Sequence, residues 1–126
     1  MLEIKDSHVH YGGIQALRGI SMEIPDGKIV TLIGANGAGK STTLRSITHI
    51  VKPFSGSITY NGEELLKLST QEIVKRGITL VPEGRRVFPD LTVTENLKIG
   101  AFLRQDTDGI KKDMDFCLLY TSRNAA

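Results

Sequence analysis

The stretch IGANGAGKST, residues Ile33–Thr42, decides the fold of this chain of 126 residues. The preceding segment, Lys28–Ile33, is apolar at most positions, which predicts a strand buried on both faces of a parallel sheet. The following residues Leu44, Ile47 and Val51 recur at helical spacing and predict a helix. The glycine-rich stretch is therefore expected to be the loop between a buried strand and a helix of an α/β fold.

The spacing of glycine, lysine and serine in this loop is that of a phosphate-binding loop, Gly-x-x-x-x-Gly-Lys-Ser. The glycines allow backbone N–H groups to form a nest for an anion, and the helix N-terminus adds its positive dipole end. Lys40 can reach the β and γ phosphates of a nucleotide, and the Ser41 hydroxyl can ligate Mg²⁺. The predicted nucleotide-binding residues of the loop are Gly34, Asn36, Gly37, Ala38, Gly39, Lys40, Ser41 and Thr42.

The composition argues against several other classes of protein. The 16 basic and 14 acidic residues give a net charge of +2 and are scattered, so there is no electrostatic case for nucleic-acid binding. No apolar run approaches the roughly 18–20 residues of a transmembrane helix. Cys117 is the single cysteine, and the N-terminus lacks the layout of a secretory signal. We therefore expect a cytoplasmic protein in which the Cys117 thiol is inert.

Further elements are predicted from alternation, turn residues and helix caps. The predicted strands are 1–11, 20–24, 57–60 and 78–81, and the predicted turns are Pro25–Gly27 and Asn61–Gly62. Capping-box patterns at Ser69–Glu72 and Thr92–Glu95 predict two helices. The first helix is expected to end at Gly77, the second to cover 96–103, and a third to cover 108–116.

Several motifs outside the loop narrow the family. They are Tyr11-Gly-Gly-Ile-Gln-Ala-Leu17, Ser55-Gly-Ser-Ile58, Asn61-Gly62, and Val81-Pro-Glu-Gly-Arg-Arg-Val-Phe-Pro89 followed by Leu91-Thr-Val-Thr-Glu-Asn-Leu97. With the loop, they resemble the ATP-binding subunits of ABC transporters, and most closely those of branched-chain amino acid importers, for which Pro-Glu-Gly-Arg-Arg is characteristic. The resemblance covers Met1 to about Phe116. It implies an α/β fold of the P-loop NTPase class, an ABC-type ATPase with an N-terminal antiparallel β portion, truncated before the signature motif and the second core strand.

The resemblance also implies roles for residues outside the loop. Tyr11 matches the aromatic residue that stacks on adenine; the alternative is an ordinary tyrosine at a strand end. Glu83 stands where most family members have a glutamine that contacts Mg²⁺ and the attacking water; the alternative is a solvated loop acid. Lys40 and Glu83 are then the expected catalytic residues, and Ser41 and Glu83 the expected Mg²⁺ ligands.

Three other positions stand out in the same comparison. Arg85 and Arg86 could contact the γ-phosphate, but adjacent arginines in a loop are more often a solvated or partner-facing pair. His49 stands where the family often has a glycine that ends the helix, which leaves the exit of that helix open.

The resemblance predicts motifs that these 126 residues do not contain. They are the Leu-Ser-Gly-Gly signature, a buried strand ending in Asp-Glu and a switch histidine, so the chain as written is not expected to hydrolyse ATP. The sequence Cys117-Leu-Leu-Tyr-Thr-Ser122 is the translation of TGTCTCTTATACACATCT, a transposon end that is ligated to DNA for sequencing. We expect residues 1–116 to be a partial ABC nucleotide-binding domain and residues 117–126 an adapter-derived tail. Without the missing central strand, apolar surface should be exposed.

Three functions remain open at this point. The first is an ATP-binding subunit of a branched-chain amino acid importer, peripheral on the inner face of the cell membrane. It would use ATP and Mg²⁺, pair with a second ABC ATPase subunit and with integral membrane permease subunits, and bind no nucleic acid. The second is a soluble ABC-type ATPase that acts on nucleic acid. The third is a half-domain that binds a nucleotide or a subunit without hydrolysis.

Overall fold

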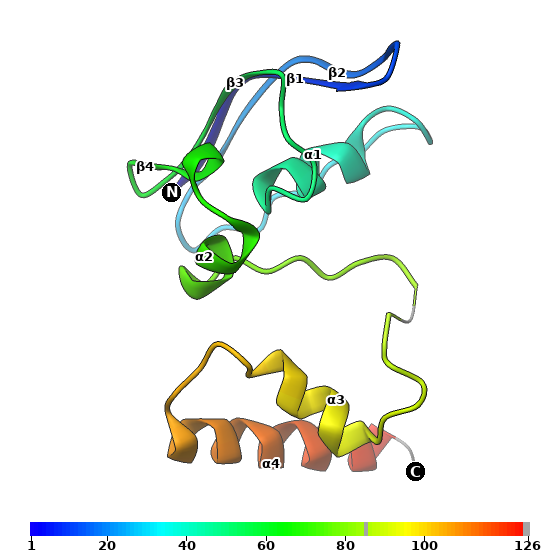
Figure 1. Ribbon diagram of the computed structural model, residues 1–126, viewed down its shortest axis with the longest axis vertical. Helices are drawn as coiled ribbons and strands as arrows, with labels where there is room; N and C mark the ends of the chain where they lie inside the picture. Colours follow the sequence, from blue (N-terminus) through cyan, green and yellow to red (C-terminus); the bar gives the residue numbers. More distant parts are fainter. Residues whose placement is uncertain (85, 125–126) are drawn as a thin grey trace. The chain divides into compact units, whose positions relative to one another are not determined.

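The computed structural model describes residues 1–84 and 86–124, and Figure 1 gives the order of the helices and strands. The chain divides into two compact units, Met1–Val81 and residues 82–126. The first unit contains the sheet, the glycine-rich loop and short helices, and the second contains two helices.

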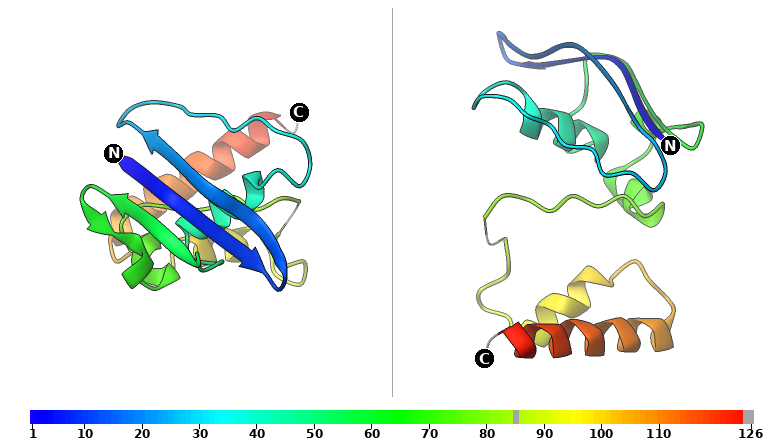
Figure 2. Two further views of the ribbon diagram at one scale, coloured as in Figure 1. Left: turned by 90° about the horizontal axis from the view of Figure 1, so that it is seen from above. Right: turned by 180° about the vertical axis from the view of Figure 1, so that it is seen from behind.

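Four antiparallel strands form the sheet of the first unit. They are β1 (Leu2–Tyr11), β2 (Ile14–Ile24), β3 (Ser55–Tyr60) and β4 (Glu63–Glu64). Their order is β2-β1-β3-β4, so β1 lies between β2 and β3, as the left view of Figure 2 shows. Ile4 of β1 pairs with Met22 of β2 and with Ile58 of β3. The predicted N-terminal antiparallel portion is confirmed, although β2 begins at Ile14 rather than at residue 20.

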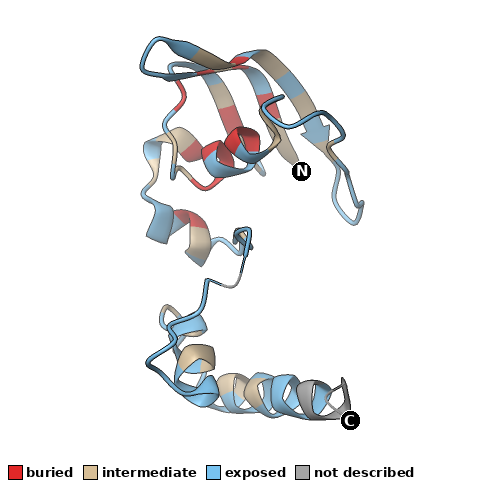
Figure 3. Ribbon diagram, turned by 90° about the vertical axis from the view of Figure 1, so that its right-hand side faces the viewer, coloured by how far each residue is buried: buried red, intermediate tan, exposed pale blue. Residues whose placement is uncertain are grey.

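Buried aliphatic side chains from the strands and from short helices form the core of this unit. The helices are α1 (Lys40–Ile47), the 3-10 helix η1 (Leu65–Lys67) and α2 (Thr70–Lys75). The buried residues of the cluster are Ile4, Ile47, Ile58, Leu65 and Ile73. Figure 3 shows the buried positions on the strands and on the helices that follow them. Because apolar burial is the main favourable term in folding, this cluster is what holds the sheet and α1 together.

Turns and helix ends in the first unit follow the local signals in the sequence. Asn61 and Gly62 have φ angles of 50° and 82°, the left-handed conformation of a two-residue hairpin turn. The Ser69 hydroxyl accepts a bond from the Glu72 N–H, and the Glu72 carboxylate accepts one from the Ser69 N–H, which completes a capping box. α2 ends before Gly77, which has a φ of 91°. These three predictions are confirmed.

His49 ends α1 without a glycine. Its φ is 60°, its N–H donates to the Ser46 carbonyl, and the Ile50 N–H donates to the Arg45 carbonyl. These two bonds form the Schellman pattern that usually has glycine at this place. The His49 Nδ1 also lies 2.6 Å from the Leu68 carbonyl oxygen, a contact that glycine lacks. This hydrogen bond offsets the strain of a conformation that side-chain-bearing residues rarely adopt.

Two predicted strands are wrong. Residues 28–33 and 78–81 have no strand structure, and Ile29, Ile33 and Val81 are 95%, 96% and 89% exposed. An apolar segment forms a buried parallel strand only where neighbouring strands take its backbone hydrogen bonds and helices cover its faces. Among the described residues, neither segment belongs to the four-stranded sheet. These two segments are therefore part of the exposed apolar surface that was expected.

Two helices form the second unit, α3 (Val93–Gly100) and α4 (Thr107–Asn124). The Thr92 hydroxyl accepts a bond from the Glu95 N–H and caps α3, as predicted, although α3 ends at Gly100 rather than at residue 103. α4 includes the predicted helix over 108–116 and continues beyond it, so the helix does not end at the predicted boundary between residues 116 and 117. The adapter origin of residues 117–126 stays a prediction. In the part of the chain that the structure describes, no helix is long and apolar enough to span a membrane.

Candidate nucleotide-binding site

The glycine-rich loop leads directly into α1. Residues 34–38 are exposed, and α1 begins at Lys40 with Gly39 as its N-cap. Gly37 and Gly39 have φ angles of 86° and 103°, backbone conformations that favour glycine. The Ala38 N–H donates to the Ala35 carbonyl at 3.1 Å, so the loop closes on itself. The predicted order of loop and helix is confirmed, and the loop lies where the first N–H groups of a helix have no partner within it.

The ammonium group of Lys40 lies over this loop. Its Nζ donates to the carbonyl oxygens of Gly34 and of Ala35, the latter at 2.9 Å. The long side chain thus folds back from the first residue of α1 to the beginning of the loop. An ammonium group has three donors, so a phosphate oxygen can join these carbonyls or replace one of them. Lys40 is therefore held where a phosphate bound in the loop would need a positive charge.

The first turn of α1 supplies hydroxyl groups. The N–H and Oγ1 of Thr43 donate to the Gly39 carbonyl at 2.9 and 2.8 Å. Thr42 and Thr43 are buried, whereas Ser41 is exposed. An exposed serine hydroxyl fits Mg²⁺, because this ion commonly combines few protein oxygens with phosphate oxygens and water. The described residues contain no cluster of three or more acidic, histidine or cysteine side chains that could hold a metal.

Tyr11 lies beside the same turn. It is the last residue of β1, it is 43% exposed, and its hydroxyl is 3.4 Å from Oγ1 of Thr42, which follows 31 residues later. An exposed aromatic ring can stack on a base while its hydroxyl keeps a polar partner. The structure therefore brings the residue predicted to stack on adenine next to the loop predicted to bind phosphate.

β2 lies against the other side of the loop, which the sequence analysis did not predict. A Cβ built on Gly39 would lie 2.7 Å from Leu17 Cδ2 and 3.1 Å from the Ala16 carbonyl oxygen. Gly39 therefore approaches the strand more closely than a residue with a side chain could. A hollow of about 120 Å³ near this contact is lined by Ile20, Met22, Leu32, Ile33, Ala38, Gly39, Lys40 and Thr43. The signal that could have indicated Leu17 was its place at the end of the motif that begins at Tyr11.

Glu83 belongs to the second unit, whereas Lys40 belongs to the first. Glu83 is exposed, and its backbone carbonyl accepts a bond from Arg86 Nε at 3.1 Å. Arg86 thus contacts the backbone of its own loop, and Arg85, the other member of the predicted pair, lies outside the described residues. The expected roles of Glu83 at Mg²⁺ and at the attacking water stay predictions.

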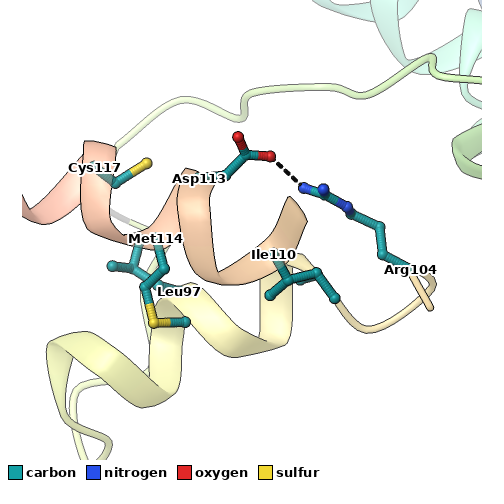
Figure 4. A pocket seen from close by; sticks show the side chains of 8 residues that line it. Leu97, Arg104, Ile110, Asp113, Met114 and Cys117 are labelled. Atoms are coloured by element: carbon teal, nitrogen blue, oxygen red, sulfur yellow. Dashed lines mark hydrogen bonds and ion pairs between the residues drawn. The ribbon is translucent and has the colours of Figure 1, made fainter. Parts of the chain in front are cut away.

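A second pocket, of about 170 Å³, is lined by residues of α3, α4 and the segment between them (Figure 4). Its apolar lining includes Leu97, Ile110, Met114 and Cys117. At its edge, Arg104 donates to Asp113 at 2.6 Å and to both carboxylate oxygens of Asp106. Hydrogen bonds from Arg104 lower the pKa of Asp106, and the same bonds raise the pKa of Arg104. The charges at this pocket are therefore paired with one another within the second unit.

Comparison with known proteins supports the nucleotide-binding interpretation. A family model described as ABC transporter matches residues 17–124. The high-affinity branched-chain amino acid transport ATP-binding protein BraG of Pseudomonas aeruginosa is 50% identical over 91% of this chain and 49% of its own length. The phosphonates import ATP-binding protein PhnC 2 of a Synechococcus strain is 44% identical over 70% of this chain and 34% of its own length. The chain thus spans about half the length of BraG, or less in the case of PhnC 2.

Solved structures give the same result for the fold. A structure described as an ATP binding subunit of an ABC transporter is 33% identical and superimposes with a TM-score of 0.71, covering 81% of this chain and 42% of that one. The ATP-binding cassette MJ0796, in a dimeric post-hydrolysis state bound to ADP and Pi, is 26% identical with a TM-score of 0.78. The match covers 94% of this chain and 56% of MJ0796.

Proposed function

The chain belongs to the ABC transporter family, and we propose that it is the N-terminal part of an ATP-binding subunit that drives the import of branched-chain amino acids. The 50% identity to BraG over nearly the whole chain supports this substrate class. The identity to the phosphonates import protein is lower and extends over less of the chain. The Pro82–Arg86 stretch, Pro-Glu-Gly-Arg-Arg, which resembles that of branched-chain importers, supports the same substrate class.

One observation carries the nucleotide part of the proposal: the Lys40 ammonium lies over the glycine loop at the N-terminus of α1. The backbone N–H groups, the helix dipole and Lys40 bind the β and γ phosphates of ATP. Ser41 and Glu83 hold Mg²⁺, which neutralises charge on the phosphates when it is bound. Tyr11 stacks on the adenine ring.

The proposal includes two kinds of partner. A second ABC subunit closes over the bound ATP, and this closure acts on integral membrane permease subunits at the inner face of the cell membrane. The dimeric MJ0796 structure supports the first contact, and the similarity to BraG, a transport ATP-binding protein, supports the second.

The nucleotide part is tested by equilibrium binding of Mg-ATP to the chain and to its Lys40→Ala variant. Loss of the charge at the phosphates should weaken binding at least about tenfold. The matched control is Lys52→Ala, because Lys52 is an exposed lysine of the same unit that follows α1, whereas Lys40 is the first residue of α1. Equal affinities of the Lys40→Ala variant and the unmodified chain would refute the proposed site.

The transport part needs the complete reading frame. Expressed in bacteria that lack their branched-chain importer ATPase, it should restore uptake of labelled leucine, and its Lys40→Ala variant should not. Uptake of a phosphonate or a pentose without uptake of leucine would leave the ATPase assignment in place and overturn the substrate class.

A further inference from the structure

One buried apolar side chain of the sheet lies beside the phosphate loop. Leu17 of β2 is 1% exposed, and a Cβ on Gly39 would lie 2.7 Å from its Cδ2. The Ala16 carbonyl oxygen limits the approach of Gly39 from the same strand, at 3.1 Å from that Cβ position. The loop therefore lies against β2 at Gly39, the N-cap residue of α1.

The strand beneath the loop is itself firmly held. Leu17 pairs with Val9 of β1, and Val9 is completely buried. Beside the turn of the same hairpin, the Tyr11 hydroxyl lies 3.4 Å from Oγ1 of Thr42 in the first turn of α1. The hairpin of β1 and β2 thus contacts the loop–helix junction at two places, Gly39 and Thr42.

We propose that Leu17 is a positioning residue for phosphate binding: its side chain sets the place of Gly39 and, through Gly39, the direction of the first N–H groups of α1. The inference rests on the proposed nucleotide site, because it concerns the same loop. Gly39 has a φ of 103°, and its carbonyl accepts two bonds from Thr43, so a shift of Gly39 also turns the beginning of the helix. Donors that are displaced in this way no longer point at one phosphate group.

The side chain of Leu17 is suited to this role by its shape. Its Cδ2 reaches the loop, whereas a valine in the same place would end at Cγ and leave a gap under Gly39. Valine is favoured in strands, so the substitution tests the contact without removing a strand residue. A methionine is long enough to fill the gap again.

The test measures two affinities, for Mg-ATP and for inorganic triphosphate with Mg²⁺, in the 126-residue chain and its variants. Leu17→Val should weaken the binding of both probes by the same factor, about tenfold, because the loss lies at the phosphates that the probes share. Leu17→Met should restore both affinities. Val9→Ala is the matched control, because Val9 is the buried partner of Leu17 across the strand pair.

The possible results separate the two proposals. If Leu17→Val binds triphosphate as tightly as the unmodified chain does, or if Val9→Ala loses as much affinity, Leu17 only stabilises the sheet and the inference is wrong. Weaker binding of ATP alone would place the effect at the base or ribose and also overturn it. If the unmodified chain binds neither probe, the proposed nucleotide site fails and the inference fails with it. Circular dichroism of each variant gives its folded fraction, by which the apparent affinity is corrected.

Discussion

The two units of the chain are stabilised by different interactions. The first unit buries aliphatic side chains from β1, β3, α1, η1 and α2 in one cluster. In the second unit, none of the described residues 82–84 and 86–120 is buried, and even the rings of Phe102 and Phe116 are 80% and 70% exposed. The second unit is held instead by hydrogen bonds to the loop backbone and by ion pairs at its surface. The first unit therefore depends on packing, and the second on polar contacts that are each worth less.

The functional residues divide along the same line. Tyr11, Leu17, Lys40 and Ser41 belong to the unit with a core, where buried neighbours fix the backbone that carries them. Glu83 belongs to the unit without a core, on an exposed loop. A phosphate-binding loop needs donors that are fixed before the ligand arrives, and the core of the first unit provides this. Glu83, proposed as a Mg²⁺ ligand, lies instead on a segment that lacks buried residues and should open more easily.

The largest effect should come from the core of the first unit. Ile58→Ala removes a completely buried side chain and should lower the free energy of unfolding by about 3 kcal/mol, because it leaves a cavity. Phe102→Ala in the second unit is the control and should change it by less than about 0.5 kcal/mol, because that ring is mostly exposed. Urea unfolding followed by circular dichroism measures both. If Phe102→Ala lowered the free energy of unfolding as much as Ile58→Ala does, the second unit would have a core that the structure does not contain.

A smaller effect is expected at Asn96, which holds the loop before α3. Its Oδ1 accepts from the Phe88 N–H at 2.9 Å, and its Nδ2 donates to the carbonyls of Phe88, Leu91 and Thr92 at 3.1, 3.3 and 2.9 Å. Asn96→Ala should lower the local opening free energy by about 1–2 kcal/mol, measured by hydrogen exchange of the Phe88 amide. Asn96→Asp keeps the acceptor and loses the donors, so its exchange should be intermediate. Unchanged exchange in the alanine variant would mean that the polar contacts do not stabilise this unit.

The sequence predicted local features well and non-local ones poorly. The capping box at Ser69 and the turn at Asn61 are confirmed, because a few adjacent residues determine each of them. The glycine loop and the helix after it are confirmed for the same reason. The strands over 28–33 and 78–81 are wrong, because a strand exists only beside another strand, and that neighbour cannot be read from the segment itself. Leu17 was missed because its contact with Gly39 depends on how the hairpin folds over the loop.

Acid should lower the stability of the first unit, because folding lowers the pKa of two of its carboxyl groups. Hydrogen bonds from the Ser69 backbone and side chain lower the pKa of Glu72, and the Arg76 guanidinium lowers that of Glu63. A carboxylate whose pKa is lowered by folding stabilises the fold above its unfolded pKa, and this contribution disappears as the pH falls through the folded pKa. Unfolding measured at about pH 6 and about pH 3 should therefore show a loss of stability in acid.

Glu72→Gln is the matched variant for this measurement. Glutamine can still accept the Ser69 N–H in a capping box but does not titrate, so the variant should lose less stability in acid than the unmodified chain. The same loss in both proteins would mean that the Glu72 charge contributes nothing to the fold of the first unit.

The smallest effect is expected for the ion pairs of the second unit. Arg104 binds Asp106 with two nitrogens and Asp113 with a third, an arrangement that lysine cannot reproduce. Arg104 is 39% exposed at its side chain, so water and salt screen these charges. Arg104→Lys should therefore increase hydrogen exchange in α4 less than Asn96→Ala increases it in the loop before α3, and the increase should vanish in about 1 M salt. Lys111→Arg, an exposed change on α4 outside this network, is the control and should have no effect. If Arg104→Lys opened α4 as much as Asn96→Ala opens the loop, the ion pairs of Arg104 would act as a substitute for a core. The two units would then differ in the kind of interaction that stabilises them but not in how strongly they are stabilised.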